Sequence, residues 1–437
     1  MLQIEHLTLT HKKDLRPLVK DFNFTLNKSD KVAIIGEEGN GKSTLLLAIA
    51  NPELVEPYIE IQGHIFSKGL RIEYLPQELP SQYAKITLYD YFLEDEQFFS
   101  YTSGELAHIT SLLKLPLTIF YSDQLLNTLS GGEKVKIQLA RLLLKQPDVL
   151  LLDEPSNDLD IDTLIWLEDF IIHYPFPIMF ISHDETLVKN SANVIIHLEQ
   201  LRKKSVPRHT ISRTSYEIYM EQRHIALHHQ EKNAVNERII FHKKTEKFRR
   251  IQQKVQQQQN AISRQDPHGG ALLKQKMHTV KAMERRYEKE GENLTEFPEY
   301  EKPMFSMFDS AISIPTKKEI LHLQLPKLLI GDRMLSQNIE LHVRGPEKIC
   351  IIGKNGSGKT TLIKLIAQQL LSRKDIRTAY MPQNYEDLLP MNQTPVEFLA
   401  TDGLQTTISK MRTYLGSMNY TSDEMLHPIS QLSGGQK

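Results

Sequence analysis

The chain has 437 residues, of which 40% are hydrophobic and 24% charged, so two or three globular domains are expected rather than one core. No apolar run approaches the roughly 18 to 20 residues that span a bilayer, and the amino terminus has no signal-peptide pattern, so we expect a cytoplasmic protein without a membrane segment. The single cysteine, Cys350, excludes an internal disulfide and a cysteine-based zinc site, and its apolar neighbours predict a small core residue.

The net charge of −1 hides an uneven distribution of charge along the chain. Residues 201–290 contain 21 Lys and Arg against 9 Asp and Glu, whereas the remainder contains 32 against 45. A basic stretch between two acidic regions favours a polyanionic partner. A long helix with a well-solvated surface would have the same composition, so charge alone leaves both interpretations open.

The first motif with a chemical signature is GEEGNGKST at residues 36–44, which follows the apolar strand pattern KVAII and precedes a helical pattern. It fits the P-loop pattern G-x4-G-K-[ST]. Its glycines let consecutive backbone N–H groups surround a phosphate, and the following helix adds the positive end of its dipole. We therefore expect Lys42 to reach the β- and γ-phosphates of ATP and Ser43 to bind Mg²⁺.

Further motifs follow in a fixed order: YLPQ ending at Gln77, LSGGE at residues 129–133, VLLLDEP at residues 149–155 and ISHDE around His183. Asp153 is expected to hold Mg²⁺ and Glu154 to orient or deprotonate the attacking water. His183 is expected to sense the γ-phosphate. An acidic turn or a lone histidine after a strand is by itself as readily structural, and the ordered series is what favours catalysis.

The middle of the chain predicts a helical hairpin. Apolar residues recur at every seventh position in Leu227, Ala234, Phe241, Phe248 and Val255, which is the seam of a long helix. Asp266, Pro267, Gly269 and Gly270 then favour a turn, and a second stripe is formed by Leu273, Met277, Val280 and Tyr287. The simplest arrangement is an antiparallel pair with basic outer faces.

The remaining third repeats the first. GKNGSGKTT at residues 353–361, YMPQ ending at Gln383 and LSGGQ at residues 432–436 recur in the original order. Alternation of strand and helix patterns predicts a parallel or mixed sheet with flanking helices in each copy. Counterparts of Asp153, Glu154 and His183 would fall near positions 456, 457 and 486, so the second copy is expected to be incomplete, as a fragment or a truncated product.

Each LSGG motif is too far from its own P-loop to share one phosphate, so we expect the copies to pair head to tail. Two copies on one chain make a stable oligomer unnecessary. ATP on the first loop would be closed by Ser433, Gly434 and Gly435, and ATP on the second by Ser130, Gly131 and Gly132. The other residues expected to bind ATP are Gly36, Glu37, Glu38, Gly39, Asn40, Gly41, Lys42, Ser43, Thr44, Gln77, Gly353, Lys354, Asn355, Gly356, Ser357, Gly358, Lys359, Thr360, Thr361 and Gln383. Those expected to contact Mg²⁺ are Ser43, Gln77, Asp153, Thr360 and Gln383.

With these motifs the chain resembles the ABC-F family of duplicated ATP-binding cassettes without membrane domains. The linker run LLKQKMHTVKAMERR at residues 272–286 is similar to the linker pattern of that family. The resemblance implies an α/β fold with two P-loop cassettes, the second incomplete, joined by the hairpin: residues 1–200, 201–300 and 301–437. It also implies ATP hydrolysis with Mg²⁺ and binding of the hairpin to rRNA at the ribosomal exit site, toward the peptidyl-transferase centre.

Members of this family serve as translation factors or protect ribosomes from antibiotics, and the sequence leaves that choice open. The alternative from another class is the ATPase subunit of a transporter with separate membrane subunits, which would share every cassette motif. A nucleic-acid repair ATPase with a coiled-coil insert is a third interpretation. The basic hairpin between the two copies, and not within one, favours the ribosomal interpretation over both.

Overall fold

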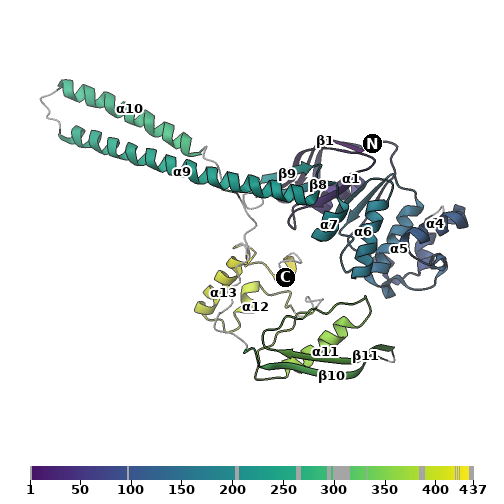
Figure 1. Ribbon diagram of the computed structural model, residues 1–437. Helices are drawn as coiled ribbons and strands as arrows, with labels where there is room; N and C mark the ends of the chain where they lie inside the picture. The colour runs from purple at the N-terminus through teal and green to yellow at the C-terminus, as the bar shows by residue number, and fades with distance from the viewer. Residues whose placement is uncertain are drawn as a thin grey trace. The chain divides into compact units, whose positions relative to one another are not determined.

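The computed structural model describes residues 2–95, 98–201, 206–261, 267–292, 297–298, 315–331, 333–382, 389–418, 420, 422 and 424–432. The chain divides into two compact units, one formed by Met1–Tyr216 with Lys302–Lys437 and the other by Glu217–Glu301 (Figure 1). The first unit contains both P-loops and the second contains the basic helical region. The finer division into domains at residues 200 and 300 stays a prediction.

The first copy of the repeat contains a six-stranded sheet in the spatial order β5-β6-β7-β3-β8-β9. Five strands are parallel, and β9 runs antiparallel to β8 at one edge. The strands are β3 (Lys31–Ile35), β5 (Ile72–Leu75), β6 (Val149–Asp153), β7 (Ile178–Ile181), β8 (Val194–Gln200) and β9 (Val206–Ser212). Every residue of β6 and β7 is buried, as continuous apolar runs in a parallel sheet predict. The predicted boundary at residue 200 thus falls between two strands of one sheet.

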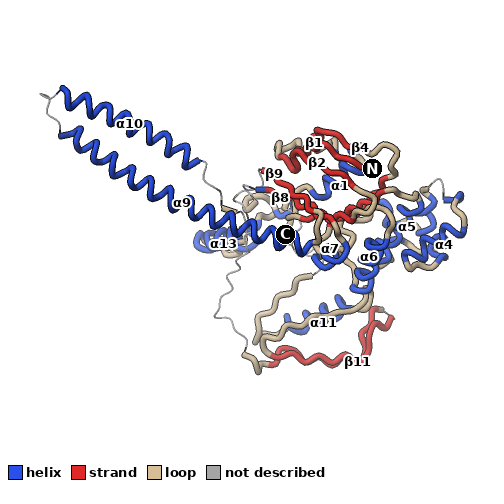
Figure 2. Tube along the Cα trace, turned by 45° about the horizontal axis from the view of Figure 1, so that its top comes forward, coloured by secondary structure: helices blue, strands red, loops and turns tan. Residues whose placement is uncertain are grey.

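A second, antiparallel sheet in the order β2-β1-β4 lies against the same core. Its strands are β1 (Leu2–His11), β2 (Pro17–Leu26) and β4 (Ile59–Phe66). Leu45, Leu46 and Ile49 of α1 (Lys42–Ala50) pack in one hydrophobic cluster with strands of both sheets, and Figure 2 shows α1 among these strands. The helix that follows the P-loop is therefore fixed by the centre of the core.

Short helices surround these sheets in chain order. The α-helices are α2 (Pro52–Val55), α3 (Leu88–Leu93), α4 (Ser103–Leu113), α5 (Gly131–Leu144), α6 (Ile161–His173) and α7 (Glu185–Ser191). The 3-10 helices are η1 (Ser81–Lys85), η2 (Phe98–Ser100), η3 (Leu117–Tyr121) and η4 (Leu126–Thr128). Both α4 and α5 begin with a complete capping box, which satisfies backbone N–H groups at their first turns.

The second copy contains the antiparallel hairpin β10 (Glu319–Ile330) and β11 (Arg333–Arg344), followed by α11 (Lys359–Leu371), α12 (Pro395–Leu399), α13 (Gln405–Ser417) and η6 (Ile429–Gln431). The predictions of a strand at residues 348–352 and of a buried Cys350 are wrong, since this run has no strand and Cys350 is exposed. In the first copy the corresponding strand β3 lies between β7 and β8. Within the described part of the second copy, no strand flanks the run, so nothing hydrogen-bonds or covers it.

The second unit is the predicted antiparallel hairpin of α9 (Tyr216–Ala261) and α10 (Pro267–Glu292), which run side by side in Figure 1. At 46 residues α9 is about 69 Å long, from the rise of an α-helix. Phe248, Val255 and Val280 form its core with Met277 and Tyr287, so this part of the predicted seam is confirmed. None of the described helices, long or short, combines the length and hydropathy needed to cross a bilayer.

Candidate active site

The first P-loop lies between the end of β3 and the start of α1. Gly36, Gly39 and Gly41 have φ values of 144°, 77° and 86°, which favour glycine over residues with a side chain. A Cβ on Gly36 would overlap the carbonyl oxygen of Leu198, so glycine is also required by the approach of β8. The loop geometry therefore depends on both backbone freedom and the neighbouring strand.

Lys42 is 6% exposed, and its Nζ donates hydrogen bonds to the carbonyl oxygens of Gly36 at 2.8 Å and Glu37 at 2.9 Å. Burial lowers the pKa of Lys42, and the carboxylates of Glu154, Glu38, Asp153 and Glu37 oppose that shift. The ammonium is thus folded over the loop and surrounded by groups that stabilise its charge. It is suited to moving onto a phosphate oxygen that enters the loop.

Asp153 ends β6 and is 2% exposed. Its Oδ1 accepts a hydrogen bond from Ser43 Oγ at 3.0 Å, and its Oδ2 accepts one from Tyr74 OH at 2.8 Å. Burial raises the pKa of Asp153, whereas these two hydrogen bonds act in the opposite direction. Burial and the Asp153 charge raise the pKa of the Tyr74 hydroxyl, which therefore stays a donor.

The Ser43 hydroxyl and the Asp153 carboxylate fit Mg²⁺, a hard cation that prefers oxygen ligands. Within the described part of the chain no group of three or more His, Cys, Asp or Glu side chains could hold a metal. Mg²⁺ in nucleotide sites is commonly held by one or two carboxylates together with substrate phosphates and water, so one serine and one aspartate suffice.

Glu154 follows directly and has a left-handed backbone, with φ of 48°. Its Oε1 lies 3.0 Å from His183 Nε2, and its Oε2 accepts a hydrogen bond from Asn157 Nδ2 at 3.0 Å. The predicted pair of Glu154 and His183 is thus in direct contact. A carboxylate held by two partners next to a P-loop is placed to orient a water molecule.

Three of the predicted first-site residues lie outside the described residues: Ser433, Gly434 and Gly435. Gln77 is described and exposed just after β5, and no hydrogen bond joins its side chain to Ser43 or Asp153 in the described part of the chain. Its role as an Mg²⁺ contact stays a prediction. The corresponding Gln383 also lies outside the described residues.

The second P-loop repeats the geometry of the first. Lys359 Nζ donates hydrogen bonds to the carbonyl oxygens of Gly353 at 2.7 Å and Lys354 at 2.9 Å, the positions that correspond to the partners of Lys42. Gly356 and Gly358 have φ values of 74° and 93°. Gly358 is the N-cap of α11, as Gly41 is of α1.

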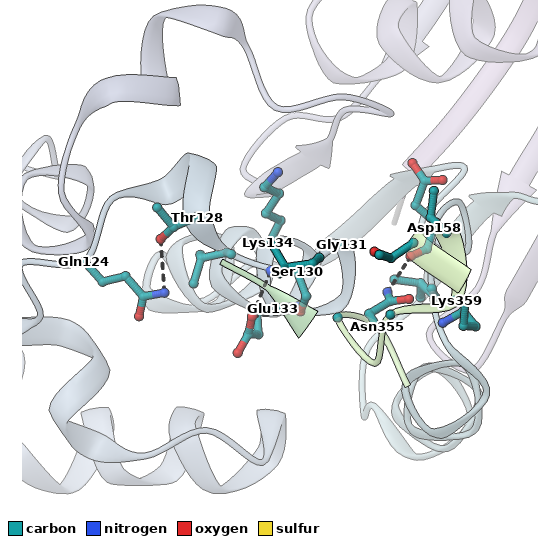
Figure 3. A pocket seen from close by; sticks show the side chains of 16 residues that line it. Gln124, Thr128, Ser130, Gly131, Glu133, Lys134, Asp158, Asn355 and Lys359 are labelled. Atoms are coloured by element: carbon teal, nitrogen blue, oxygen red, sulfur yellow. Dashed lines mark hydrogen bonds between the residues drawn. The ribbon is translucent and has the colours of Figure 1, made fainter. Parts of the chain in front are cut away.

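The second P-loop and the first LSGGE motif line one cavity of about 930 Å³ (Figure 3). Asn355 donates its backbone N–H to Asp160 Oδ2 at 2.9 Å and its side-chain N–H to the carbonyl of Asp158 at 2.8 Å. Head-to-tail pairing therefore appears at this end as predicted. The lining residues are Gln124, Thr128, Leu129, Ser130, Gly131, Glu133, Lys134, Asp158, Leu159, Ile330, Asn355, Gly356, Gly358, Lys359, Thr360 and Thr361.

Ser130 is the N-cap of α5 and exchanges hydrogen bonds with Glu133 in a capping box. A Cβ on Gly131 would come within 2.7 Å of the Asp158 carbonyl oxygen, and one on Gly132 equally near Thr163 Oγ1. The two glycines therefore allow α5 to pack closely on the segment after Asp153. That packing presents the helix N-terminus to the cavity.

Comparison with known proteins agrees with this geometry. A family model described as "ABC transporter" matches residues 19–157 and 336–437, which together exceed half of the chain. Relatives include the probable ATP-binding protein YheS of Escherichia coli K12, at 25% identity over 98% of this chain and 68% of YheS. The ABC transporter F family member 2 of Arabidopsis thaliana is 25% identical over 96% of this chain and 65% of its own length. This chain belongs to the ATP-binding-cassette family, in its F branch.

The ribosome protection protein VmlR of Bacillus subtilis is a further relative of this ABC-F chain, at 27% identity over 96% of this chain and 72% of VmlR. Cassettes of this family bind nucleotide, and in the ABC-F chain both P-loops, Asp153 and the Glu154–His183 pair have the arrangement that such binding requires. Sequence reasoning missed Tyr74, Asn157 and Asp160. Tyr74 and Tyr380 open the repeated YLPQ and YMPQ motifs, so the repeat itself was a signal for Tyr74.

Proposed function

We propose that this ABC-F chain binds and hydrolyses ATP and uses the resulting closure and release of its cassettes to act on the ribosome. The hairpin would bind rRNA near the exit site and reach toward the peptidyl-transferase region. The observation that carries the ribosomal part is the exposed basic surface of the α9–α10 hairpin. The P-loops and the Glu154–His183 pair carry the ATPase part.

In the proposed reaction Lys42 leaves the carbonyl oxygens of Gly36 and Glu37 and pairs with phosphate oxygens of ATP. Glu154 accepts a proton from the water that attacks the γ-phosphorus, and His183 keeps the Glu154 carboxylate oriented. Bound Mg²⁺, held through Ser43 and Asp153, would neutralise charge that develops on the phosphates.

ATP at the second P-loop would occupy the cavity between Lys359 and Ser130. The N-terminus of α5 offers backbone N–H groups and the positive end of a helix dipole to an anion there. Nucleotide would thus join the two cassettes, and hydrolysis would weaken the contact.

The hairpin has the chemistry of an RNA-binding surface. Residues 243–254 contain six Lys and Arg against one Glu. All six cations, Lys243, Lys244, Lys247, Arg249, Arg250 and Lys254, are exposed, while Phe248 and Val255 between them face the hairpin core. A row of exposed cations on a stiff helical support gains free energy by releasing counterions from nucleic-acid phosphates.

The name of the relative VmlR, a ribosome protection protein, supports the same partner. The competing function, a transporter ATPase subunit, gives the basic hairpin no role. Association with ribosomes instead of membrane subunits is therefore the distinguishing measurement.

The proposal is tested by sedimenting the chain with 70S ribosomes in the presence of a non-hydrolysable ATP analogue. Changing Lys243, Lys244 and Lys247 to Glu should weaken ribosome binding by about tenfold or more at low salt and flatten its dependence on salt, because phosphate contacts are lost. Nucleotide affinity should stay unchanged, since none of these residues lies in a P-loop.

A matched control makes the same change of charge on the first cassette, at the exposed residues Lys20, Lys28 and Lys68. This control should bind ribosomes much more like the unchanged chain. Equal binding by both variants and the unchanged chain would show that the basic hairpin is only a solvated surface. Drug susceptibility of the host with and without the gene would then separate antibiotic protection from a general role in translation.

A further inference from the structure

We propose that Tyr74 is a positioning residue that holds the Asp153 carboxylate in the orientation needed to bind the Mg²⁺ of the bound nucleotide. The inference rests on the proposed ATP-binding function of the first P-loop and adds a residue to it. The observation is the hydrogen bond of 2.8 Å from Tyr74 OH to Asp153 Oδ2.

The strand register brings these two residues together. Tyr74 lies in β5 and pairs with Leu151 of the parallel strand β6. Asp153 is two residues beyond Leu151, and side chains two apart project from the same face of a sheet. Tyr74 therefore extends along that face until its hydroxyl meets the carboxylate.

The Tyr74 ring is held by the protein core, so its hydroxyl has a fixed position. Tyr74 and Ile72 pack against the hydrophobic cluster that contains α1 and the central strands. Asp153 itself is 2% exposed, so little water is available to satisfy Oδ2 if the tyrosine hydroxyl is removed. A buried carboxylate oxygen without a donor is costly, and the side chain would rotate to find another one.

The two Asp153 oxygens have separate tasks. Tyr74 occupies Oδ2, and Oδ1 faces Ser43, whose hydroxyl is the other oxygen expected to contact Mg²⁺. Fixing Oδ2 therefore fixes Oδ1 as well, since the carboxylate is planar. Loss of the Tyr74 hydroxyl should harm the response to Mg²⁺ more than the binding of nucleotide phosphates, which depends on the P-loop and Lys42.

The test measures the affinity of the 437-residue chain for a non-hydrolysable ATP analogue with Mg²⁺ and with EDTA. The ratio of the two dissociation constants reports coupling between nucleotide and metal without any turnover. Lys359→Ala is present throughout, so that the first P-loop dominates the signal. Tyr74→Phe keeps the ring and should reduce the Mg²⁺-dependent gain in affinity by about tenfold, the loss expected from one buried hydrogen bond to a charged group.

The affinity measured in EDTA should stay within about twofold, because the P-loop contacts remain. The control Tyr58→Phe removes the hydroxyl of a neighbouring tyrosine that does not contact Asp153 and should change neither constant. Replacing Mg²⁺ by Mn²⁺, which binds a given site more tightly, should restore part of the loss.

A double-mutant cycle with Asp153→Asn distinguishes positioning from general damage. If Tyr74 acts through the carboxylate, Tyr74→Phe should have no further effect on the metal response once Asp153 is replaced. An undiminished Mg²⁺ response in Tyr74→Phe, or an equal further loss in the Asp153→Asn background, would overturn the inference. A chain with Tyr74 intact that binds no analogue would instead overturn the proposed ATP function and this inference with it.

Discussion

The two P-loops of this chain have the same lysine geometry but different surroundings. Lys42 and Lys359 each donate to the two corresponding carbonyl oxygens at 2.7 to 2.9 Å. The strand before the first loop is buried between β7 and β8, whereas the corresponding residues 348–352 form no strand. Loop conformation is therefore set by local sequence, while strand formation depends on partners distant in the chain.

The largest expected effect comes from a group that the first P-loop has beside it. Glu154→Gln should lower the rate of single-turnover ATP hydrolysis by about 10²- to 10³-fold, because the attacking water loses its base. ATP affinity should be preserved, since the contacts of Lys42 with the loop are unchanged. Quench-flow measurement of phosphate release would check both expectations.

Glu73→Gln is a suitable control for this change, because Glu73 pairs with Lys145 away from the P-loop. It should leave turnover unaltered. If Glu154→Gln hydrolysed ATP at the unchanged rate, Glu154 would have no catalytic role and the carboxylate–histidine pair would be structural.

The next effect concerns the first glycine of each P-loop. Gly36→Ala should destabilise the first cassette by about 2 to 4 kcal/mol, since φ is 144° and a Cβ would overlap the Leu198 carbonyl. Gly353→Ala should cost much less, because its Cβ would approach only the Ser357 side chain, at 3.0 Å. The chain's single tryptophan, Trp166, is buried in α6 and reports unfolding of the first cassette by fluorescence.

In urea titrations Gly36→Ala should move the Trp166 transition to lower denaturant, while Gly353→Ala should leave it in place. Equal shifts for the two variants would mean that the contact with β8 is not what distinguishes the loops.

These comparisons also show how far sequence alone could predict the structure. The P-loops, the LSGGE helix start and the Asp153–Glu154 strand end follow from local patterns, and the hairpin core follows from its apolar periodicity. The exposed Cys350 could not be predicted, because the apolar run KICII looks like a buried strand whatever its neighbours are. The Tyr74 and Asn157 contacts depend on strand register and on the left-handed turn at Glu154, which no local pattern specifies.

Cys350 offers a chemical measure of the difference between the two surroundings. It is exposed, whereas Ala33, at the corresponding position of the first copy, is 0% exposed. In native protein Cys350 should react with a thiol reagent at least about tenfold faster than a cysteine introduced by Ala33→Cys in a Cys350→Ala background. Similar rates for the two thiols would mean that the run around Cys350 is covered in solution.

The smallest expected effect lies at Asn355, where the second P-loop contacts the segment after Asp153. Asn355→Ala removes the side-chain hydrogen bond to the Asp158 carbonyl but keeps the backbone hydrogen bond to Asp160, so analogue affinity at the second P-loop should fall by about three- to tenfold. Glu38 occupies the corresponding position of the first loop. Asn355→Glu should therefore weaken binding further than Asn355→Ala, because it places a carboxylate beside the Asp158 carbonyl and the Asp160 carboxylate. Titrating both variants with the analogue in a Lys42→Ala background isolates the second site. Equal affinities for the Ala and Glu variants would show that charge at this contact does not distinguish the two loops.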